Sequence, residues 1–515
     1  MTASSPFSKN DRDLIFLVVL FAIGLTVFEL WLATTKHDNS RDQHLGTAVV
    51  YARGHIDLMR PVILGYNANG APTPLEFPIW QAVTAIFMKA FGIWYGWGNV
   101  TSLLFFFGSL WALFDLCRRE NSERAGWWAV FFSLIQPLSL VCGGQAAADG
   151  AAWAFAMWFI YSAYRMMNEG KWRWWFLAVL VGSLGAMTKA PFFMTAGLTT
   201  FFWLCLRHRT SVRAWAFLAS SGVISTLFFL AWNYHCHKVY KEAEYPYWEL
   251  DTFGGIHTKI YKWYLGSMAY RLNMHTWKRL GWHLYNMVFD GSALAFLVIA
   301  SVWFRRSLAA WVWLLAAAMT TEVFPILIVE HSHYLFIFAP AVAWLCAVAA
   351  VELEPGIWNL LKAATTTRCI ILLSTFLCSL PGLCMLMRAT LPDSYNQEIA
   401  DLIEQHTSPD EKIIVWGQIW GSPFLRAHRD GLTGGAGFTT AGWLDDDPQK
   451  LERLKQLGFR KIVVIKPSPF TVAVTEASGG EIETPDDLHK VLPPKARNWP
   501  VAFETPQLLI VQIPQ

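Results

Sequence analysis

Long apolar stretches separated by short polar loops run through most of the chain. Many of them approach the roughly 20 residues that an α-helix needs to cross a bilayer. This pattern predicts a polytopic α-helical membrane protein. The apolar stretches fall at 14–34, 77–98, 100–117, 125–143, 151–166, 174–192, 193–206, 214–232, 291–304, 308–328, 334–351 and 369–387.

The composition supports this class. Only 15% of the 515 residues are charged and 54% are hydrophobic, whereas a soluble domain typically carries about 25% charged residues. The 28 Trp, 36 Phe and 15 Tyr residues fit a chain with many membrane–water interfaces. A net charge of +3 gives no basis for nucleic-acid binding.

Lys and Arg in the short loops predict the orientation, because such loops face the cytoplasm. Consecutive basic loops must then be separated by an even number of crossings. Only the first interval fails, since it holds three apolar stretches, and an even number is restored if 77–98 does not cross but is a re-entrant or juxtamembrane helix on the outer side. About eleven crossings result, with the C-terminus outside. The basic clusters are Lys9/Arg12, Arg118/Arg119/Arg124, Arg165/Lys171/Arg173, Arg207/Arg209/Arg213, Arg305/Arg306 and Lys362/Arg368.

The chain after residue 388 has a different pattern. The segments 412–417, 461–466 and 508–513 are typical of buried strands, and 447–459 is typical of an amphipathic helix. The glycine-rich segment 431–438 has no phosphate-loop ending and is expected to be a loop. We therefore predict two domains. They are a transmembrane catalytic module, 1–387, with outer loops 35–99 and 233–290, and a small outer α/β domain, 388–515.

The predicted topology places the unusual ionisable residues near the membrane on its outer face. Charged side chains inside a membrane are costly and mark functional sites. Their gathering on one face predicts a single active site or binding cavity. These residues are Glu76, Asp149, Lys189, Glu330, His331 and His333.

Each of the candidate residues also has a plain structural alternative. Asp42, after the first crossing, can act as a general base, bind a metal or orient a hydroxyl, or it can cap a helix. The carboxylate of Glu76 suits the positive end of a helix, and Asp149 can be another helix cap. Lys189 can bind a phosphate or extend toward the interface.

Several segments form an ordered set of motifs. They are RDQH (41–44), NGAPTPLEFPIWQA (69–82), KAFG (89–92), AADGAAWAF (147–155), TKAPF (188–192) and EHSHYLFIFAP (330–340). Over this set the chain resembles the GT-C superfamily of membrane glycosyltransferases, in particular the protein mannosyltransferase-like branch that includes the lipid A aminoarabinose transferases. Two departures, Gln43 and Phe77, argue against aminoarabinose as the sugar.

The resemblance implies a polyprenyl-phosphate-linked sugar donor, a lipid, glycan or protein acceptor, and inversion at the anomeric carbon. It also implies a multi-pass protein, which we expect in a bacterial inner membrane with its active site facing the periplasm. In this interpretation Asp42 is the base, and Glu76 and Asp149 orient substrates. The residues expected at the donor phosphate are Lys189, Arg271, His331 and His333.

Three alternatives stay open at this point. His331 or His333 can instead be an interfacial aromatic that is hydrogen-bonded to Glu330. A divalent metal can be held by Glu76 with one outer-loop histidine, namely His257, His275 or His283. Finally, the chain can be a secondary transporter with Asp149 and Lys189 as substrate or ion ligands. That class predicts inverted repeats, and the sequence has none that we can detect.

Overall fold

The computed structural model divides into two compact units. The helical unit comprises Met1–Thr34, Gly96–Asn233 and Gly255–Leu391, and the sheet-containing unit comprises Thr35–Tyr95, Tyr234–Gly254 and Pro392–Gln515. The structure describes residues 9–35, 42–244, 264–289, 304–361, 395–416, 427, 429–434, 448–466, 487–492 and 494–514.

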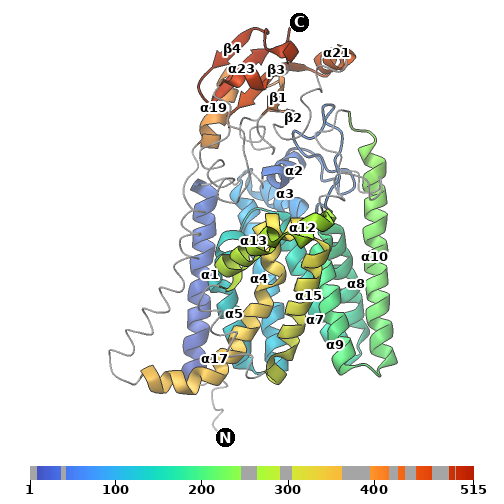
Figure 1. The fold of residues 1–515 in the computed structure, drawn as a ribbon, viewed down its shortest axis with the longest axis vertical. Helices are drawn as coiled ribbons and strands as arrows, with labels where there is room; N and C mark the ends of the chain where they lie inside the picture. The colour runs from blue at the N-terminus through green and yellow to red at the C-terminus, as the bar shows by residue number, and fades with distance from the viewer. Residues whose placement is uncertain are drawn as a thin grey trace. The chain divides into compact units, whose positions relative to one another are not determined.

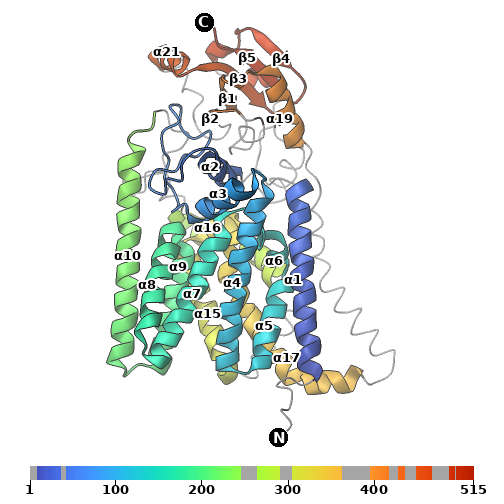
Figure 2. The ribbon, with the colours of Figure 1, turned by 180° about the vertical axis from the view of Figure 1, so that it is seen from behind.

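Long helices make up the helical unit (Figures 1 and 2). α7 packs against α4, α8 and α9, α5 packs against α4 and α17, and α15 packs against α9 and α17. The described helices of this unit are α1 (Lys9–Thr35), α4 (Gly96–Glu120), α5 (Glu123–Ile135), α6 (Pro137–Cys142), α7 (Ala148–Glu169), α8 (Trp172–Thr188), α9 (Ala190–Arg207), α10 (Val212–Tyr240, its last turns in the other unit), α12 (Met268–Leu272), α13 (Met274–Leu284), the π-helical turn η1 (Tyr285–Phe289), α15 (Phe304–Val323), α16 (Pro325–Glu330), the 3-10 turn η2 (Ser332–Ile337) and α17 (Ala339–Leu361).

This unit has the surface of a membrane protein. Among the described residues, three helices are long and apolar enough to cross a bilayer, namely α1 over Leu14–Trp31, α4 and α10. Large apolar side chains stay exposed on all three, such as Phe16 on α1, Leu104 on α4 and Leu227 on α10. Such exposure is costly in water and is stable against lipid.

Proline divides two of the predicted crossings, so each was wrong as a single helix. The stretch 125–143 becomes α5 and α6, with Pro137 opening α6. The stretch 308–328 ends α15 at Val323, and Pro325 opens α16. Proline is favoured in the first turn of a helix. In the interior it breaks or kinks the helix, because it has no backbone N–H to donate to the carbonyl four residues earlier.

The predicted outer helix in 77–98 is α3 (Ile79–Phe91), which has 13 residues and belongs to the sheet-containing unit. At 1.5 Å per residue it is about 20 Å long, against roughly 30 Å of hydrocarbon. Its length therefore favours a helix that does not cross. Residues 290–303 and 362–394 lie outside the described residues, so the count of eleven crossings stays a prediction.

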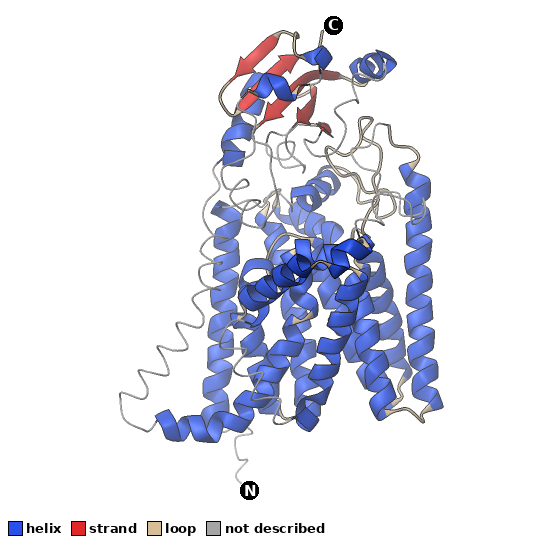
Figure 3. Ribbon diagram, viewed as in Figure 1, coloured by secondary structure: helices blue, strands red, loops and turns tan. Residues whose placement is uncertain are grey.

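The sheet-containing unit carries all the described strands (Figure 3). They form one sheet in the order β2-β1-β3-β5-β4, in which β1 pairs in parallel with β2 and β3, and β5 pairs antiparallel with β3 and β4. Its elements are α2 (Asp42–Arg53), α3, α19 (Tyr395–His406), β1 (Lys412–Trp416), β2 (Gly431–Gly434), α21 (Pro448–Gln456), β3 (Phe459–Ile465), α23 (Leu488–Val491), the 3-10 turn η3 (Pro494–Ala496), β4 (Val501–Glu504) and β5 (Leu508–Gln512).

The three predicted strands and the helix between two of them are confirmed as β1, β3, β5 and α21. The expectation of a loop at 431–438 was wrong for its first half, because Gly431–Gly434 forms β2. This strand is fixed by its neighbours. It pairs with β1 from Ile413 to Trp416, and Leu432 also bridges to Gly65. Pairing of this kind overrides a weak strand propensity.

Candidate active site

Asp149 lies in the first turn of α7 and is 3% exposed. The residue at the N-cap position is Ala147, whose backbone is extended and whose side chain makes no cap. The alternative of Asp149 as a helix cap is therefore wrong. Its carboxylate lies at the positive end of the helix dipole, which stabilises the charge, and it is available to other side chains.

Lys189 is the residue between α8 and α9. It ends α8 and precedes α9 in an extended conformation, and Pro191 follows in the first turn of α9. This break between two helices points its side chain at α7. The Nζ atom of Lys189 lies 2.9 Å from Oδ1 of Asp149, and both side chains are nearly buried.

The 3-10 turn η2 brings two more groups to the same place. Nε2 of His333 lies 3.4 Å from Oδ1 of Asp149. Nζ of Lys189 donates to the hydroxyl of Tyr334 at 3.3 Å and lies 5.1 Å from the centre of its ring. The ring of His331 lies 5.4 Å from that of His333. The structure thus joins three sequence-predicted residues, Asp149, Lys189 and His333, and adds Tyr334.

Aromatic rings form the wall behind this cluster. Phe192 stacks on Tyr334 at 5.4 Å, and Trp153 contacts Phe192 at 6.0 Å and stacks on Phe336 at 6.1 Å. An apolar wall lowers the local dielectric and strengthens every charge interaction within it. The cluster therefore combines one acid, one lysine, one histidine and one phenol in a water-poor setting. Such a set can hold an anionic group.

Glu330 has other partners. Its carboxylate pairs with Arg279 at 2.7 Å and accepts from the hydroxyl of Tyr270 at 2.8 Å. Within the described part of the chain these are its side-chain partners, so the alternative of a histidine bonded to Glu330 was wrong. Burial, followed by the hydrogen bond to Glu330, raises the pKa of Tyr270 well above its usual value.

Arg271, expected at the donor phosphate, donates instead to the backbone carbonyls of Leu265, Glu322 and Val323. Two of these carbonyls end α15, and a cation there suits the negative end of the helix. The structure gives this arginine a capping position. Its predicted role at the phosphate stays a prediction.

Glu76 lies in the sheet-containing unit beside His44. Nδ1 of His44 lies 3.9 Å from Oε2 of Glu76 and 3.1 Å from Nε2 of Gln81. These three residues line one small pocket with Thr47 and Thr73. Asp42 is the first residue of α2, two positions before His44, and its side chain lies outside the described parts. Its role as base stays a prediction.

The donor set for a metal is incomplete in the described residues. No cluster of three His, Cys, Asp or Glu side chains occurs among them. Glu76 and His44 supply two candidate ligands, and zinc in proteins normally takes three or four. Of the outer-loop histidines, His257 lies outside the described residues. For His283, burial and then nearby Arg279 lower the pKa, which favours a neutral ring.

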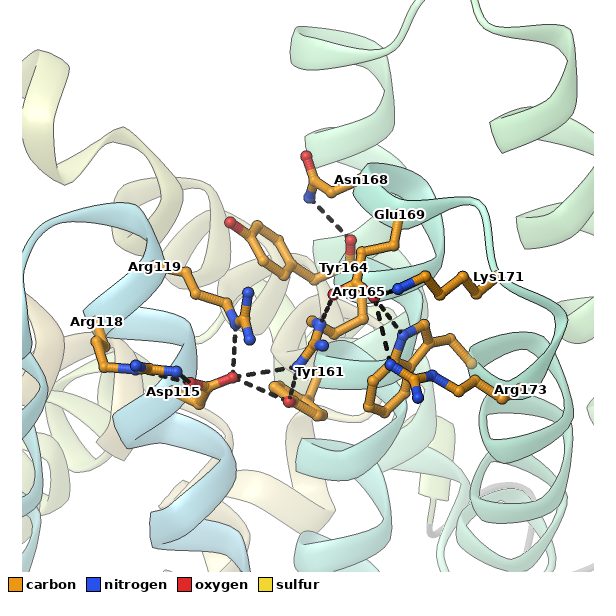
Figure 4. A network of polar contacts seen from close by, with 11 residues as sticks. Asp115, Arg118, Arg119, Tyr161, Tyr164, Arg165, Asn168, Glu169, Lys171 and Arg173 are labelled. Carbon is orange, nitrogen blue, oxygen red and sulfur yellow. Dashed lines mark hydrogen bonds and ion pairs between the residues drawn. The ribbon is translucent and has the colours of Figure 1, made fainter.

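A second buried acid lies at the other end of α7 (Figure 4). Asp115 of α4 is 3% exposed and pairs with Arg118 at 2.9 Å and Arg119 at 2.6 Å. From α7 it accepts from Tyr161 at 2.9 Å and pairs with Arg165 at 3.4 Å. Asp115 was not among the six near-membrane ionisable residues that the sequence analysis placed on the outer face, and the placement of those six stays a prediction. It lies at the end of the apolar stretch 100–117, directly before Arg118 and Arg119, which pair with it.

Sequence analysis also missed Glu29. This side chain, in the apolar α1, is 1% exposed. It accepts from the backbone N–H of Gly144 at 3.2 Å and from Asn99 at 3.5 Å. A carboxyl within an apolar stretch is unusual in itself, so the signal was present in the sequence.

The sequence and the fold are similar to those of known proteins. Residues 73–234 match the family model for dolichyl-phosphate-mannose-protein mannosyltransferase. ArnT from Cupriavidus metallidurans has 14% identity and a TM-score of 0.61 over 96% of this chain and 97% of that one. Its structure bound to undecaprenyl phosphate has 14% identity and a TM-score of 0.59 over 96% and 98%. No curated protein sequence matches the chain closely enough to count as a relative.

An archaeal structure matches as well. The oligosaccharyltransferase of Archaeoglobus fulgidus, in complex with Zn and sulfate, has 12% identity and a TM-score of 0.51 over 88% of this chain and 67% of that one. Together these matches define the chain as a membrane protein with the GT-C glycosyltransferase fold. Within this class, residues 73–234 are similar to the protein mannosyltransferase family model, and the chain shares its fold with ArnT.

Proposed function

We propose that this chain is an integral-membrane glycosyltransferase that transfers a sugar from a polyprenyl-phosphate-linked donor to an acceptor, with inversion. The observation that carries the proposal is the buried cluster of Asp149, Lys189, His333 and Tyr334 in a GT-C fold. A similar structure, ArnT, is known in complex with undecaprenyl phosphate. We expect the same class of lipid phosphate here.

In this proposal the donor phosphate competes with Asp149 for Lys189. The side chain of Lys189 is 9% exposed and already lies between a carboxylate and a phenol. A lysine is a compact charge on a flexible stem, so it can turn from one anion to another. His333, next to the same carboxylate, and His331 supply further donors to the phosphate. The apolar helices hold the lipid tail.

The chemical step follows from the roles of the acids. The acceptor oxygen attacks the anomeric carbon while the bond from that carbon to the phosphate oxygen breaks, and polyprenyl phosphate leaves. In the proposal Asp42 takes the proton of the acceptor hydroxyl, and Glu76 and Asp149 orient the substrates. Lys189 stabilises the charge that grows on the leaving phosphate. Arg271 would join it only by leaving its carbonyl partners.

The predicted orientation assigns the reaction to the outer face of the membrane, which for a bacterial inner membrane is the periplasm. The positions of Lys and Arg in the loops support this orientation. Acceptors of this class are a lipid, a glycan or a protein. Phe77 and Gln43 stand where the aminoarabinose branch carries charged residues, so we expect another sugar.

The test uses purified protein in lipid nanodiscs with a panel of radiolabelled undecaprenyl-phosphate sugars, and it measures the release of undecaprenyl phosphate. Asp42→Asn is compared with Asp410→Asn, which changes an exposed acid. For a hydroxyl acceptor we expect at least a 100-fold loss in the first variant and none in the second. Full turnover by Asp42→Asn would remove Asp42 as the base. In a parallel measurement with proteoliposomes, transport of labelled donor across the bilayer without turnover would favour a transporter.

A further inference from the structure

We infer that Glu29 is a positioning residue that fixes the segment leading into Asp149. For its catalytic consequence this inference rests on the proposed function. Glu29 is a buried carboxyl in the apolar helix α1. In the described part of the chain its hydrogen-bond partners are the N–H of Gly144 and the amide of Asn99. Neither of them is a cation.

One of these partners, Gly144, lies just before the helix that carries Asp149. Gly144 lies in the short connection between the end of α6 at Cys142 and the start of α7 at Ala148. Asp149 is the second residue of α7. A hold on Gly144 therefore sets the path of the chain five residues before the acid that pairs with Lys189.

The approach between the two is unusually close. A Cβ atom added to Gly144 would lie under 3.0 Å from three carbons of the Glu29 side chain. Only glycine allows the backbone to come so near to α1. The contact thus depends on two residues. Glu29 on α1 supplies the buried acceptor, and Gly144 in the connection has no side chain that would prevent the approach.

A second attachment holds the same connection from α4. The hydroxyl of Ser102 donates to the carbonyl of Gln145 at 2.7 Å and to that of Ala147 at 3.4 Å. Asn99, the other partner of Glu29, is one turn earlier on the same helix. Hydrogen bonds from both α1 and α4 therefore hold the connection, and they fix the position at which α7 begins. Placing a reacting group to within about 1 Å can change rates on the order of 100-fold.

Glu29 differs from Asp115 and Asp149, the other acids described as buried in this unit, because both of those have cationic partners. Asp115 has arginines around it, which explains its burial through charge pairing. Glu29 bonds to a backbone N–H at the connection. Burying its carboxyl costs free energy, which its hydrogen bonds to Gly144 and Asn99 offset in part. The bond to Gly144 also orders the segment that leads to Asp149.

The first test needs no substrate. Hydrogen–deuterium exchange of residues 143–150 is compared between the wild type, Glu29→Ala and Gly144→Ala, with Thr26→Ala as the control. Thr26 lies on the same helix, and its hydroxyl bonds to Ala22 of α1. We expect exchange in the connection to rise at least tenfold in the first two variants and to stay unchanged in the control. Unchanged exchange in Glu29→Ala would overturn the inference.

The second test separates positioning from general stability. The affinity for undecaprenyl phosphate is measured in a double-mutant cycle of Glu29→Ala and Asp149→Asn. If Glu29 acts through Asp149, Glu29→Ala weakens binding about tenfold in the wild type and less than twofold in Asp149→Asn. If Glu29→Ala weakened binding by the same factor in the wild type and in Asp149→Asn, the two effects would be independent. That result would indicate a merely structural role and overturn the inference.

Conservative replacement gives a further check. Glu29→Gln keeps the length and one acceptor oxygen, so it restores the bond to Gly144 and at least half of the affinity. No rescue by glutamine would count against the bond to Gly144 as the cause. If the wild type neither binds undecaprenyl phosphate nor turns over any donor, the proposed function fails. The exchange measurement still decides whether Glu29 fixes the connection.

Discussion

The helix α7 carries a buried acid cluster at each end, and the two clusters differ in their cations. At the beginning of the helix Asp149 meets a lysine and a histidine. Near its end Tyr161 and Arg165 meet Asp115, which is also held by two arginines of α4. Asp149 and Arg165 are about 24 Å apart along the helix axis at 1.5 Å per residue.

The difference in partners separates a structural cluster from a reactive one. Arginine is planar, always charged and fixed by several hydrogen bonds at once, so it suits a permanent pair. Lysine is a mobile point charge and histidine can change its protonation near neutral pH. The Asp115 cluster is therefore expected to govern stability, and the Asp149 cluster is expected to govern binding and turnover.

Asp115→Asn should give the largest effect, and on stability. It removes the negative charge that Arg119 and Arg165 share, and breaking a buried ion network typically costs about 3–5 kcal/mol. Thermal unfolding of the detergent-solubilised protein measures this as a large drop in the midpoint. Turnover per folded molecule should stay within twofold of the wild type. A selective loss of turnover would break the comparison.

Lys189→Met should give the next largest effect, on turnover. Loss of a group that stabilises charge in the transition state costs on the order of 100- to 1000-fold. The matched control is Lys171→Met, because Lys171 has a side chain that is 58% exposed and pairs with Glu169. We expect wild-type turnover in this control. Comparable kcat/KM values for the two variants would contradict a special role of Lys189.

His333→Gln should give a smaller loss. A hydrogen bond to a charged group is worth about 1.5–3 kcal/mol, so we expect roughly a 10- to 100-fold fall in donor affinity. His489→Gln, in the sheet-containing unit, is the control, since His489 pairs with Glu504 and should tolerate the change. An unchanged donor KM in His333→Gln would remove this histidine from the site.

An exposed ion pair should have the smallest effect on the free energy of unfolding. Glu244 pairs with Arg453 at 2.9 Å, and this hydrogen bond holds the pKa of Glu244 below its usual value. The folded pKa is depressed, so the stabilisation is present above the usual carboxyl pKa of about 4.3 and is lost as pH falls through the folded pKa. Glu244→Gln should cost less than about 1 kcal/mol.

The measurement for this pair is the pH dependence of unfolding. The difference between the wild type and Glu244→Gln should be constant near neutral pH and should vanish in acid. A difference that grows as pH falls would have the wrong sign. If Glu244→Gln lowered the free energy of unfolding as much as Asp115→Asn, burial would not determine how much an ion pair contributes to stability.

Much of the fold follows from local pattern, and its failures have local causes. Apolar stretches predict α4, α7 and α10, and short apolar runs predict β1, β3 and β5. The predicted helices that divide do so at Pro137 and Pro325. β2 was missed because Gly431–Gly434 carries almost no strand propensity and is ordered by pairing on both sides.

The candidate site was predictable as a set of residues but not as a set of contacts. Asp149, Lys189 and His333 each stand out as ionisable residues near apolar stretches. Their pairing depends on how α7, the α8–α9 break and η2 pack, which no local pattern contains. Glu29 carried the same signal, as a carboxyl within an apolar stretch, and was overlooked, whereas Asp115 directly precedes a cluster of basic residues.

The central claim is that Lys189 changes partner from Asp149 to the phosphate of a lipid-linked donor. A cryo-electron microscopy structure of the protein in nanodiscs with undecaprenyl phosphate tests it most directly. We predict a phosphate oxygen within about 2.7–3.2 Å of Nζ of Lys189, with the bond to Asp149 lengthened from 2.9 Å. A bound phosphate elsewhere, with Lys189 still paired to Asp149, would contradict the account.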